Sequence, residues 1–278
     1  MNILLTNDDG IRAPGIAAMY EALTNHTGRH DGPLGKEVMA IAPLTVQSAT
    51  GHGVTFHIPL MTEPQSIELT GEGRMIGMSV DGRPADCVKL AISNLWPERF
   101  GEGTKPDLVI SGMNDGANCG INVVYSGTVA AALEAAFLGV PSIAVSMQRG
   151  KRPSRFDVGA YWARKTIEVL IKDGLPKAHE CISINVPLCE DRGETALPPM
   201  PPIKICPMNV HGLHDKYERR VSPTGQVYYW AAGNGLDFKG TDSGSDVAEL
   251  LGGCITVTPL SYDLTRHETL KKWAERLR

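Results

Sequence analysis

The sequence predicts an α/β fold: one large domain built on a parallel sheet, with an appendage at its C-terminal end. The chain opens with a strand–helix–strand unit, in which the mainly apolar runs Asn2–Leu5 and Glu37–Pro43 flank a helical apolar pattern in Ile11–Asn25. Such a unit joins parallel strands through a right-handed crossover. The same alternation returns in the middle of the chain. A length of 278 residues suits one such domain with an addition and is short for two full domains.

Composition excludes several classes of protein. A hydrophobic content of 42% and a charged content of 21% are ordinary for a soluble globular protein. The net charge of −4 gives no indication of a surface for nucleic-acid polymers. No apolar run is long enough to span a bilayer, and no basic segment precedes the first apolar run as in a signal peptide. We therefore expect no membrane partner. Because the six cysteines are scattered without a C-x-x-C pair, we expect a reduced, cytoplasmic protein.

The segment after the opening unit predicts a hairpin region around residues 54–80, followed by a helix. Two short β-like runs occupy Val54–Leu69, separated by prolines, and Arg74–Val80 has the pattern of a third. This spacing is typical of a hairpin inserted into the sheet and not of another βα unit. The turn sequence Asp81–Pro84 then leads into Ala85–Leu95, whose apolar residues recur at helical spacing.

The middle of the chain alternates strands and helices. Three buried strands and two helices are expected in turn: Asp107–Ser111, Val129–Leu138, Ser142–Ser146, Phe156–Asp173 and Cys181–Val186. The first of these helices is rich in alanine, and its small residues let it lie close to the sheet. The second has a clear apolar face.

The composition and periodicity of the sequence change at Pro187, and we place the end of the α/β core there. Residues 1–187 form the core and residues 188–278 a C-terminal extension, because Glu194–Pro202 contains four prolines and no periodicity. The extension is expected to hold a protruding hairpin, a late core strand and a terminal helix, at Arg219–Val221 with Gln226–Ala231, at Ile255–Leu260 and at His267–Arg278. Protruding elements of this kind commonly make subunit contacts.

Two adjacent carboxylates, Asp8 and Asp9, follow the first strand directly. They lie at its C-terminal tip and at the entry to a helix, an edge where open α/β sheets bind ligands. Neighbouring carboxylates repel each other unless something neutralises them, and a hard divalent cation with oxygen ligands does so. The alternative is a helix-capping turn, because Asn-Asp-Asp-Gly is also good turn sequence. These residues alone leave both interpretations open.

Two further polar segments follow core strands and are expected at the same edge of the sheet. Thr45–Gly53 is either part of a site or a flexible polar loop. Ser111–Thr128 is rich in glycine and asparagine, so it supplies backbone N–H groups for an anion and neutral oxygens for a cation. It ends at the start of the alanine-rich helix, where hydroxyls lie beside the positive end of the helix dipole. The alternative there is an ordinary Ser/Thr cap.

Three polar segments at one edge favour a site over unrelated turns. Carboxylates, a hydroxyl, amide oxygens and an anion-binding helix start together predict metal-assisted phosphoryl hydrolysis. Other phosphate-handling motifs are absent, because the chain has neither G-x-x-x-x-G-K-[ST] nor G-x-G-x-x-G in its first βα turn.

A set of motifs in a fixed order extends along essentially the whole chain. They are Asn7–Gly10 with Ala13–Ile16, Ala42–Pro43 with Gln47–Ser48, Pro84–Val88, Ser111–Asn118, Tyr125–Ala132, Ile184–Pro187 and Thr256–Leu260. In these motifs the chain resembles the SurE family, the survival protein E nucleotidases. The resemblance implies a Rossmann-like core with helices on both faces of its sheet. It also implies hydrolysis of nucleoside 5′-monophosphates, with 3′-monophosphates as an extension.

Carried over position by position, the resemblance also implies the site residues. One divalent metal ion per subunit, Mg²⁺ or Mn²⁺, would be held by Asp8, Asp9, Ser48 and Asn114. The substrate phosphate would lie in a pocket formed by Asn118, Ser126, Gly127 and Thr128. Asp8 or Asp9 would orient or deprotonate the attacking water. The family further implies homodimers or homotetramers held partly by exchanged C-terminal elements, a role that suits the late hairpin and the terminal helix.

Two positions depart from the family's pattern, and several alternatives stay open. Ala49 follows Ser48 where the family usually has glycine, and Arg83 precedes Pro84 where it usually has threonine. His52, in the same loop as Ala49, is either a proton donor to the leaving group or simply solvated. The site also suits polyphosphate ends or other small phosphomonoesters. A rival of another class is a non-catalytic nucleotide- or metal-binding stress protein.

Overall fold

The computed structural model of the chain describes residues 1–232 and 235–278. Its centre is a nine-stranded sheet with strand order β3-β4-β2-β1-β5-β6-β7-β11-β8. The strands of this sheet are β1 Asn2–Thr6, β2 Glu37–Pro43, β3 Thr62–Glu68, β4 Arg74–Val80, β5 Leu108–Asp115, β6 Ser142–Met147, β7 Cys181–Val186, β8 Ile203–Ile205 and β11 Ile255–Leu260. A separate hairpin pairs β9 (Lys216–Val221) with β10 (Val227–Ala232). The predicted α/β fold is confirmed.

The parallel centre of the sheet contains a topological switch point. The neighbouring strands from β4 to β7 all run parallel. The chain leaves β1 toward β2 on one side and later continues with β5 on the other side of β1. Thr6 at the end of β1 pairs with Ser111 of β5, so the residues that follow β1 emerge beside the end of β5. In open α/β sheets, ligands bind outside the carboxyl ends of the strands at such a point.

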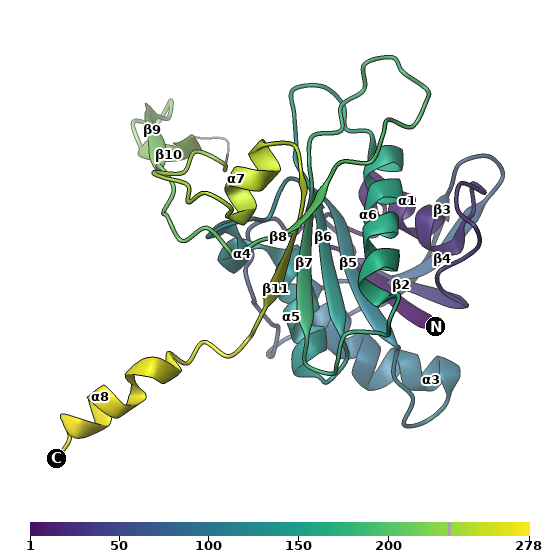
Figure 1. Cartoon of the computed structure of the whole chain (residues 1–278), viewed down its shortest axis with the longest axis horizontal. Helices are drawn as coiled ribbons and strands as arrows, with labels where there is room; N and C mark the ends of the chain where they lie inside the picture. The colour runs from purple at the N-terminus through teal and green to yellow at the C-terminus, as the bar shows by residue number, and fades with distance from the viewer. Residues whose placement is uncertain (233–234) are drawn as a thin grey trace.

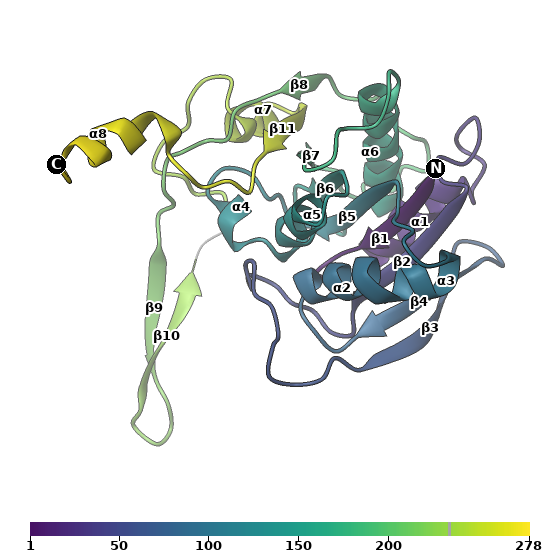
Figure 2. The ribbon, with the colours of Figure 1, turned by 90° about the horizontal axis from the view of Figure 1, so that it is seen from below.

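Helices cover both faces of the sheet (Figure 2). Ile3 and Leu5 belong to the core under α1 (Pro14–Thr24) and α6 (Phe156–Ile171). Leu4, which points to the opposite face, belongs to the core under α2 (Pro84–Leu90) and α5 (Gly127–Phe137). Because both faces are buried, the central strands are nearly continuous apolar runs, which is why their positions follow from the sequence.

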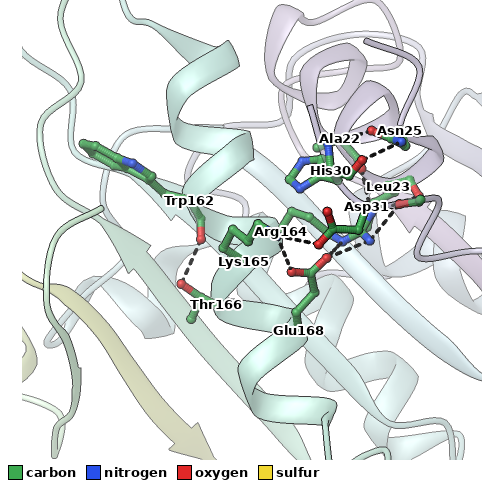
Figure 3. A network of polar contacts seen from close by, with 11 residues as sticks. Ala22, Leu23, Asn25, His30, Asp31, Trp162, Arg164, Lys165, Thr166 and Glu168 are labelled. Atoms are coloured by element: carbon green, nitrogen blue, oxygen red, sulfur yellow. Dashed lines mark hydrogen bonds and ion pairs between the residues drawn. The ribbon is translucent and has the colours of Figure 1, made fainter. Parts of the chain in front are cut away.

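A buried arginine joins the two helices of the first face (Figure 3). Arg164 of α6 is 3% exposed, and its Nη1 donates to the carbonyl oxygen of Ala22 at 2.8 Å, near the end of α1. Nη2 donates to the carbonyl oxygen of Gly32 at 3.1 Å and pairs with Glu168 at 2.8 Å. The last carbonyls of a helix lack partners within it, and a cation suits that end of the helix dipole. Arg164 therefore fixes α1 on α6.

The hairpin region differs from its prediction in one respect. Residues 54–69 hold one strand instead of two. The structure forms no strand between Val54 and Met61, and β3 continues through Pro64, where a break was expected. Pro64 pairs with Met78 at the edge of the sheet, where a residue without an N–H is tolerated. β3 and β4 do form the expected antiparallel hairpin, and β4 joins the sheet parallel to β2.

Three helical regions also differ from the prediction, one of them the single turn α4 (Asn122–Tyr125) within the polar segment Ser111–Thr128. The helix expected at Ala85–Leu95 begins at Pro84, passes through a π-helical turn at Ala91–Leu95 and continues as α3 (Trp96–Phe100). The short helix α7 (Asp246–Leu251) was not expected, because six residues show too little periodicity to indicate a helix.

The C-terminal part returns to the sheet and then leaves it. β11 pairs antiparallel with β7, and β8 pairs with β11. The β9–β10 hairpin projects from the body, and the chain after β11 carries η2 (His267–Thr269) and α8 (Leu270–Glu275) away from the sheet (Figure 1; Figure 2). We call residues 261–278 the C-terminal arm. Among the described residues, no helix is both long and apolar enough to cross a membrane.

Candidate functional site

A cleft of about 490 Å³ opens at the switch point between β1 and β5. The predicted metal and phosphate residues that line it are Asp8, Asp9, Ser48, Asn114, Asn118 and Ser126. Two others, Gly127 and Thr128, lie behind Asp8 at the start of α5. The three polar segments that were expected at one edge thus meet in a single cleft.

Asp8 is the most enclosed of the polar residues in the cleft, with 4% of its surface exposed. The hydroxyl of Thr128 donates to its Oδ1 at 2.5 Å. Gly127 lets the helix start approach this closely, because a Cβ there would lie 2.9 Å from both Cβ and Oδ2 of Asp8. Burial raises the pKa of Asp8 to about 6, although the hydrogen bonds from Thr128 act in the other direction.

Asp9 lies beside the end of β5. Its Oδ2 accepts the backbone N–H of Asp115 at 3.1 Å, and burial is the main cause that raises its pKa. The pairing of β5 with β6 shifts register between Ser111 and Asn114, and such irregularities redirect side chains. The amide nitrogen of Asn114 donates to the carbonyl oxygen of Gly116 at 2.7 Å, so its side-chain oxygen is the atom that suits a cation.

Ser48 lies in a loop, residues 44–53, that is attached to the rest of the site. The N–H of Gln47, next to Ser48, donates to the carbonyl oxygen of Asp8 at 2.8 Å. The N–H of Gly51 donates to the carbonyl oxygen of Tyr125 at 3.0 Å. The loop is therefore fixed both to the turn after β1 and to the segment before α5, which argues against the simple flexible-loop interpretation.

His52 makes the side-chain attachment of this loop. Its Nε2 lies 2.8 Å from Oε2 of Glu134 on α5, and Lys89 Nζ from α2 lies 2.9 Å from the other carboxylate oxygen. Burial tends to raise the pKa of Glu134, but the hydrogen bonds from His52 and Lys89 outweigh it and lower that pKa. Since His52 is paired with Glu134 and does not line the cleft of Asp8, the structure supports neither the proton-donor role nor a simply solvated ring.

Ser126 and Asn118 are engaged within the protein. The hydroxyl of Ser126 accepts the N–H of Val129 at 3.1 Å and so caps α5, as the alternative of an ordinary cap expected. The amide nitrogen of Asn118 donates to the hydroxyl of Ser146 at 2.9 Å, and its backbone N–H donates to Asn185. Both side chains line the cleft, and Ser126 places the start of α5 at its edge.

The donor set of the cleft fits a hard divalent cation. Within residues 1–232 and 235–278, no three His, Cys, Asp or Glu side chains come together in a way that would hold a metal ion. A cation here would therefore take neutral oxygens in addition to the carboxylates of Asp8 and Asp9, as Mg²⁺ and Mn²⁺ commonly do. Two adjacent carboxylates with raised pKa values, one buried and one partly buried, are the electrostatic feature that such a cation relieves.

The cleft also includes residues that sequence reasoning did not single out. Asp115 and Arg149 contribute charge, and Val46, Tyr125 and Leu236 contribute apolar or aromatic surface. Asp115 directly follows Asn114, and Arg149 follows β6 by two residues. Asp115 is the last residue of β5 and Arg149 lies just beyond β6, and this position at the ligand-binding edge was the signal that could have found them.

Comparisons with known proteins agree on one family. The model of the family described as Survival protein SurE matches residues 3–211. The chain is 39% identical over 277 residues to the 5′-nucleotidase SurE of Syntrophobacter fumaroxidans, covering 98% of this chain and 99% of that protein. It is 40% identical to the 5′-nucleotidase SurE of Rhodopirellula baltica, covering 98% and 97%. The crystal structure of the SurE protein from Aquifex aeolicus has a TM-score of 0.75 and 31% identity, with both chains fully covered.

Proposed function

The chain belongs to the SurE family, and from that membership we propose that it is a 5′-nucleotidase, which hydrolyses nucleoside 5′-monophosphates to nucleoside and phosphate. The observation that supports this most strongly is the adjacent Asp8–Asp9 pair at the switch point, with Asp8 buried against the start of α5. Carboxylates for a cation and a helix start for an anion within one cleft are what phosphomonoester hydrolysis needs.

We propose that Asp8, Asp9, Ser48 and Asn114 hold one divalent cation, Mg²⁺ or Mn²⁺. Such an ion, when bound, polarises the phosphoryl group and lowers the pKa of a coordinated water. Thr128 keeps Asp8 oriented through its hydroxyl. Asp8 and Asp9, both inside the cleft, are the carboxylates that can accept a proton from the attacking water.

The substrate phosphate is proposed to lie against Asn118, Ser126, Gly127 and Thr128. Backbone N–H groups at a helix start point at an anion and cost no reorganisation as charge develops. The hydroxyl of Ser126 keeps the first turn of α5 in place through its bond to Val129. The exposed side chains of Val46 and Tyr125 at the rim offer apolar surface for the nucleoside.

We further propose that the protein works as a homodimer or homotetramer. The C-terminal arm supports this, because Leu264 and Leu277 are 93% and 91% exposed, and Leu270 and Trp273 are more than half exposed. Apolar side chains on an extended arm indicate a surface that another subunit covers. A cytoplasmic location is supported by six free cysteines, which suit a reducing compartment.

Phosphate release from a panel of nucleoside 5′- and 3′-monophosphates and polyphosphate tests the proposed activity. Each substrate is measured with Mg²⁺, with Mn²⁺ and with EDTA. We expect metal-dependent release from 5′-monophosphates, and the 3′ arm decides whether the activity extends to that position. Release from polyphosphate alone would favour an exopolyphosphatase. Nucleotide binding without release by a folded, metal-loaded protein would favour the non-catalytic binding protein.

A further inference from the structure

The charge of the cleft is unbalanced for an anionic substrate. Asp8, Asp9 and Asp115 all line it, and among the described lining residues Arg149 carries the one positive charge. A divalent cation offsets two of the three carboxylates. The phosphoryl group of a nucleoside monophosphate, itself an anion, would still meet a net negative site without Arg149.

Arg149 is held at the cleft through Asp115. Its Nε lies 3.5 Å from Oδ2 of Asp115. Asp115 is fixed in turn, because Ser154 Oγ donates to its Oδ1 at 2.8 Å and its backbone N–H donates to Asp9. These contacts connect Arg149 to the carboxylate pair through one residue.

The guanidinium retains its capacity to bind a ligand. The contact with Asp115 uses Nε, and in the described part of the chain neither terminal nitrogen of Arg149 hydrogen-bonds to another residue. The side chain is 71% exposed although the residue lines the cleft. Two terminal nitrogens of a guanidinium match the spacing of two phosphate oxygens, which a lysine ammonium does not.

We propose that Arg149 binds the phosphoryl group of the substrate through its terminal nitrogens and thereby determines affinity for phosphate-bearing ligands. This inference rests on the proposed nucleotidase activity, because it identifies a further substrate-binding residue of the same cleft. Arg149 would act together with the start of α5, which would bind the remaining phosphoryl oxygens.

The loop that follows Arg149 supplies a matched control. Lys151 and Arg152 are exposed, their backbone N–H groups donate to Glu190, and neither side chain lines the cleft. Arg152→Gln therefore removes the same charge from the same loop without removing a cleft contact. Arg149→Lys keeps the charge and removes the planar fork.

The test measures steady-state kinetics on a nucleoside 5′-monophosphate and competitive inhibition by orthophosphate and by the nucleoside. Arg149→Gln should raise KM and the inhibition constant of orthophosphate by about tenfold to a hundredfold, the usual range for a hydrogen bond to a charged group. The inhibition constant of the nucleoside should stay the same. Arg149→Lys should be intermediate, and Arg152→Gln should be near the wild type.

Two results would overturn the inference: equal effects of Arg149→Gln and Arg152→Gln, or a loss of nucleoside affinity as large as the loss of orthophosphate affinity. Calorimetric binding of orthophosphate to the metal-loaded protein tests the contact independently of turnover. A wild-type protein that releases no phosphate but loses orthophosphate binding in Arg149→Gln would refute the proposed function and leave the anion contact standing.

Discussion

Three influences set the pKa of Asp8, and a short polar turn alone could not provide all of them. Burial opposes its ionisation, the negative charge of Asp9 opposes it further, and the hydrogen bonds from Thr128 favour it, with a net pKa of about 6. Without a cation, the ionised carboxylate at neutral pH is therefore an unfavourable feature of the folded state. A bound cation would reverse this, which makes the pair a site where metal and proton compete.

The raised pKa of Asp8 predicts that the free energy of unfolding of the metal-free protein depends on pH. The folded pKa of about 6 lies above the ordinary 3.8, so the stabilisation from protonated Asp8 is complete below about pH 4 and is lost as the pH rises through 6. Its size is up to about 3 kcal/mol, at 1.36 kcal/mol per pKa unit. Urea unfolding between pH 4 and pH 7 with EDTA measures it.

The control for this prediction is Asp8→Asn, which cannot titrate. Other carboxylates shift the stability in the opposite direction, as Asp157 does with its pKa near 2, so the difference between wild type and variant isolates Asp8. Wild type should lose stability relative to Asp8→Asn as the pH rises. Parallel curves would show that Asp8 is not the titrating group.

Single residues of the site were predictable to different degrees. Asp8 and Asp9 are adjacent in the sequence, so the repulsion between them was visible without a structure. The partners that define their environment were not visible, because Thr128 lies 120 residues from Asp8. The same holds for His52 and Glu134, which are 82 residues apart and meet only because α5 packs beside the loop.

At the scale of elements, loop 44–53 is the part of the site whose position depends most on neighbours. Backbone hydrogen bonds attach it at Gln47 and Gly51, and the His52–Glu134 pair attaches it to α5. Ser48 in this loop is a proposed metal ligand, and residues that hold a ligand in place change metal affinity by about tenfold to a hundredfold when they are replaced. The pair is therefore expected to control where Ser48 lies.

Removing the pair should weaken metal binding while the fold remains intact. We expect His52→Ala and Glu134→Gln each to raise the dissociation constant for Mn²⁺ about tenfold to a hundredfold, as for residues that support metal ligands. His57→Ala is the matched control, because that histidine is exposed on the segment after the same loop. Metal titration with circular dichroism distinguishes the outcomes, and equal affinity in all three variants would refute the positioning role.

Elements buried on both faces could be predicted, and elements at edges could not. The central strands β1, β2, β5, β6 and β7 are mainly apolar runs, while β3 contains Pro64 and is recognisable only once its place at the sheet edge is known. The π-helical turn at Ala91–Leu95 and the six-residue α7 depend on tertiary packing more than on local pattern.

At the scale of the whole molecule, the fold separates the cleft from the parts that project. The cleft lies at the switch point, while the β9–β10 hairpin and the C-terminal arm extend away from the body (Figure 1). The projecting elements were recognisable in the sequence, because composition and periodicity change after Pro187. The late core strand β11 was expected from the sequence, but its place in the sheet between β7 and β8 emerged only from the structure.

Deleting residues 264–278 should alter assembly and leave the subunit folded. The deleted segment contributes no residue to the described lining of the Asp8–Asp9 cleft, and its apolar side chains are exposed. We expect light scattering after size exclusion to give a smaller assembly than the full chain, with circular dichroism unchanged. An unchanged molar mass would show that the arm does not hold subunits together.

The central claim is that the Asp8–Asp9 cleft carries metal-dependent nucleotide hydrolysis. The most direct measurement compares phosphate release from a nucleoside 5′-monophosphate by wild type and Asp8→Asn, each with Mn²⁺ and with EDTA, alongside their unfolding curves. We predict release by the metal-loaded wild type alone, with Asp8→Asn folded and reduced to the level seen with EDTA. A folded Asp8→Asn protein with wild-type turnover would contradict the account.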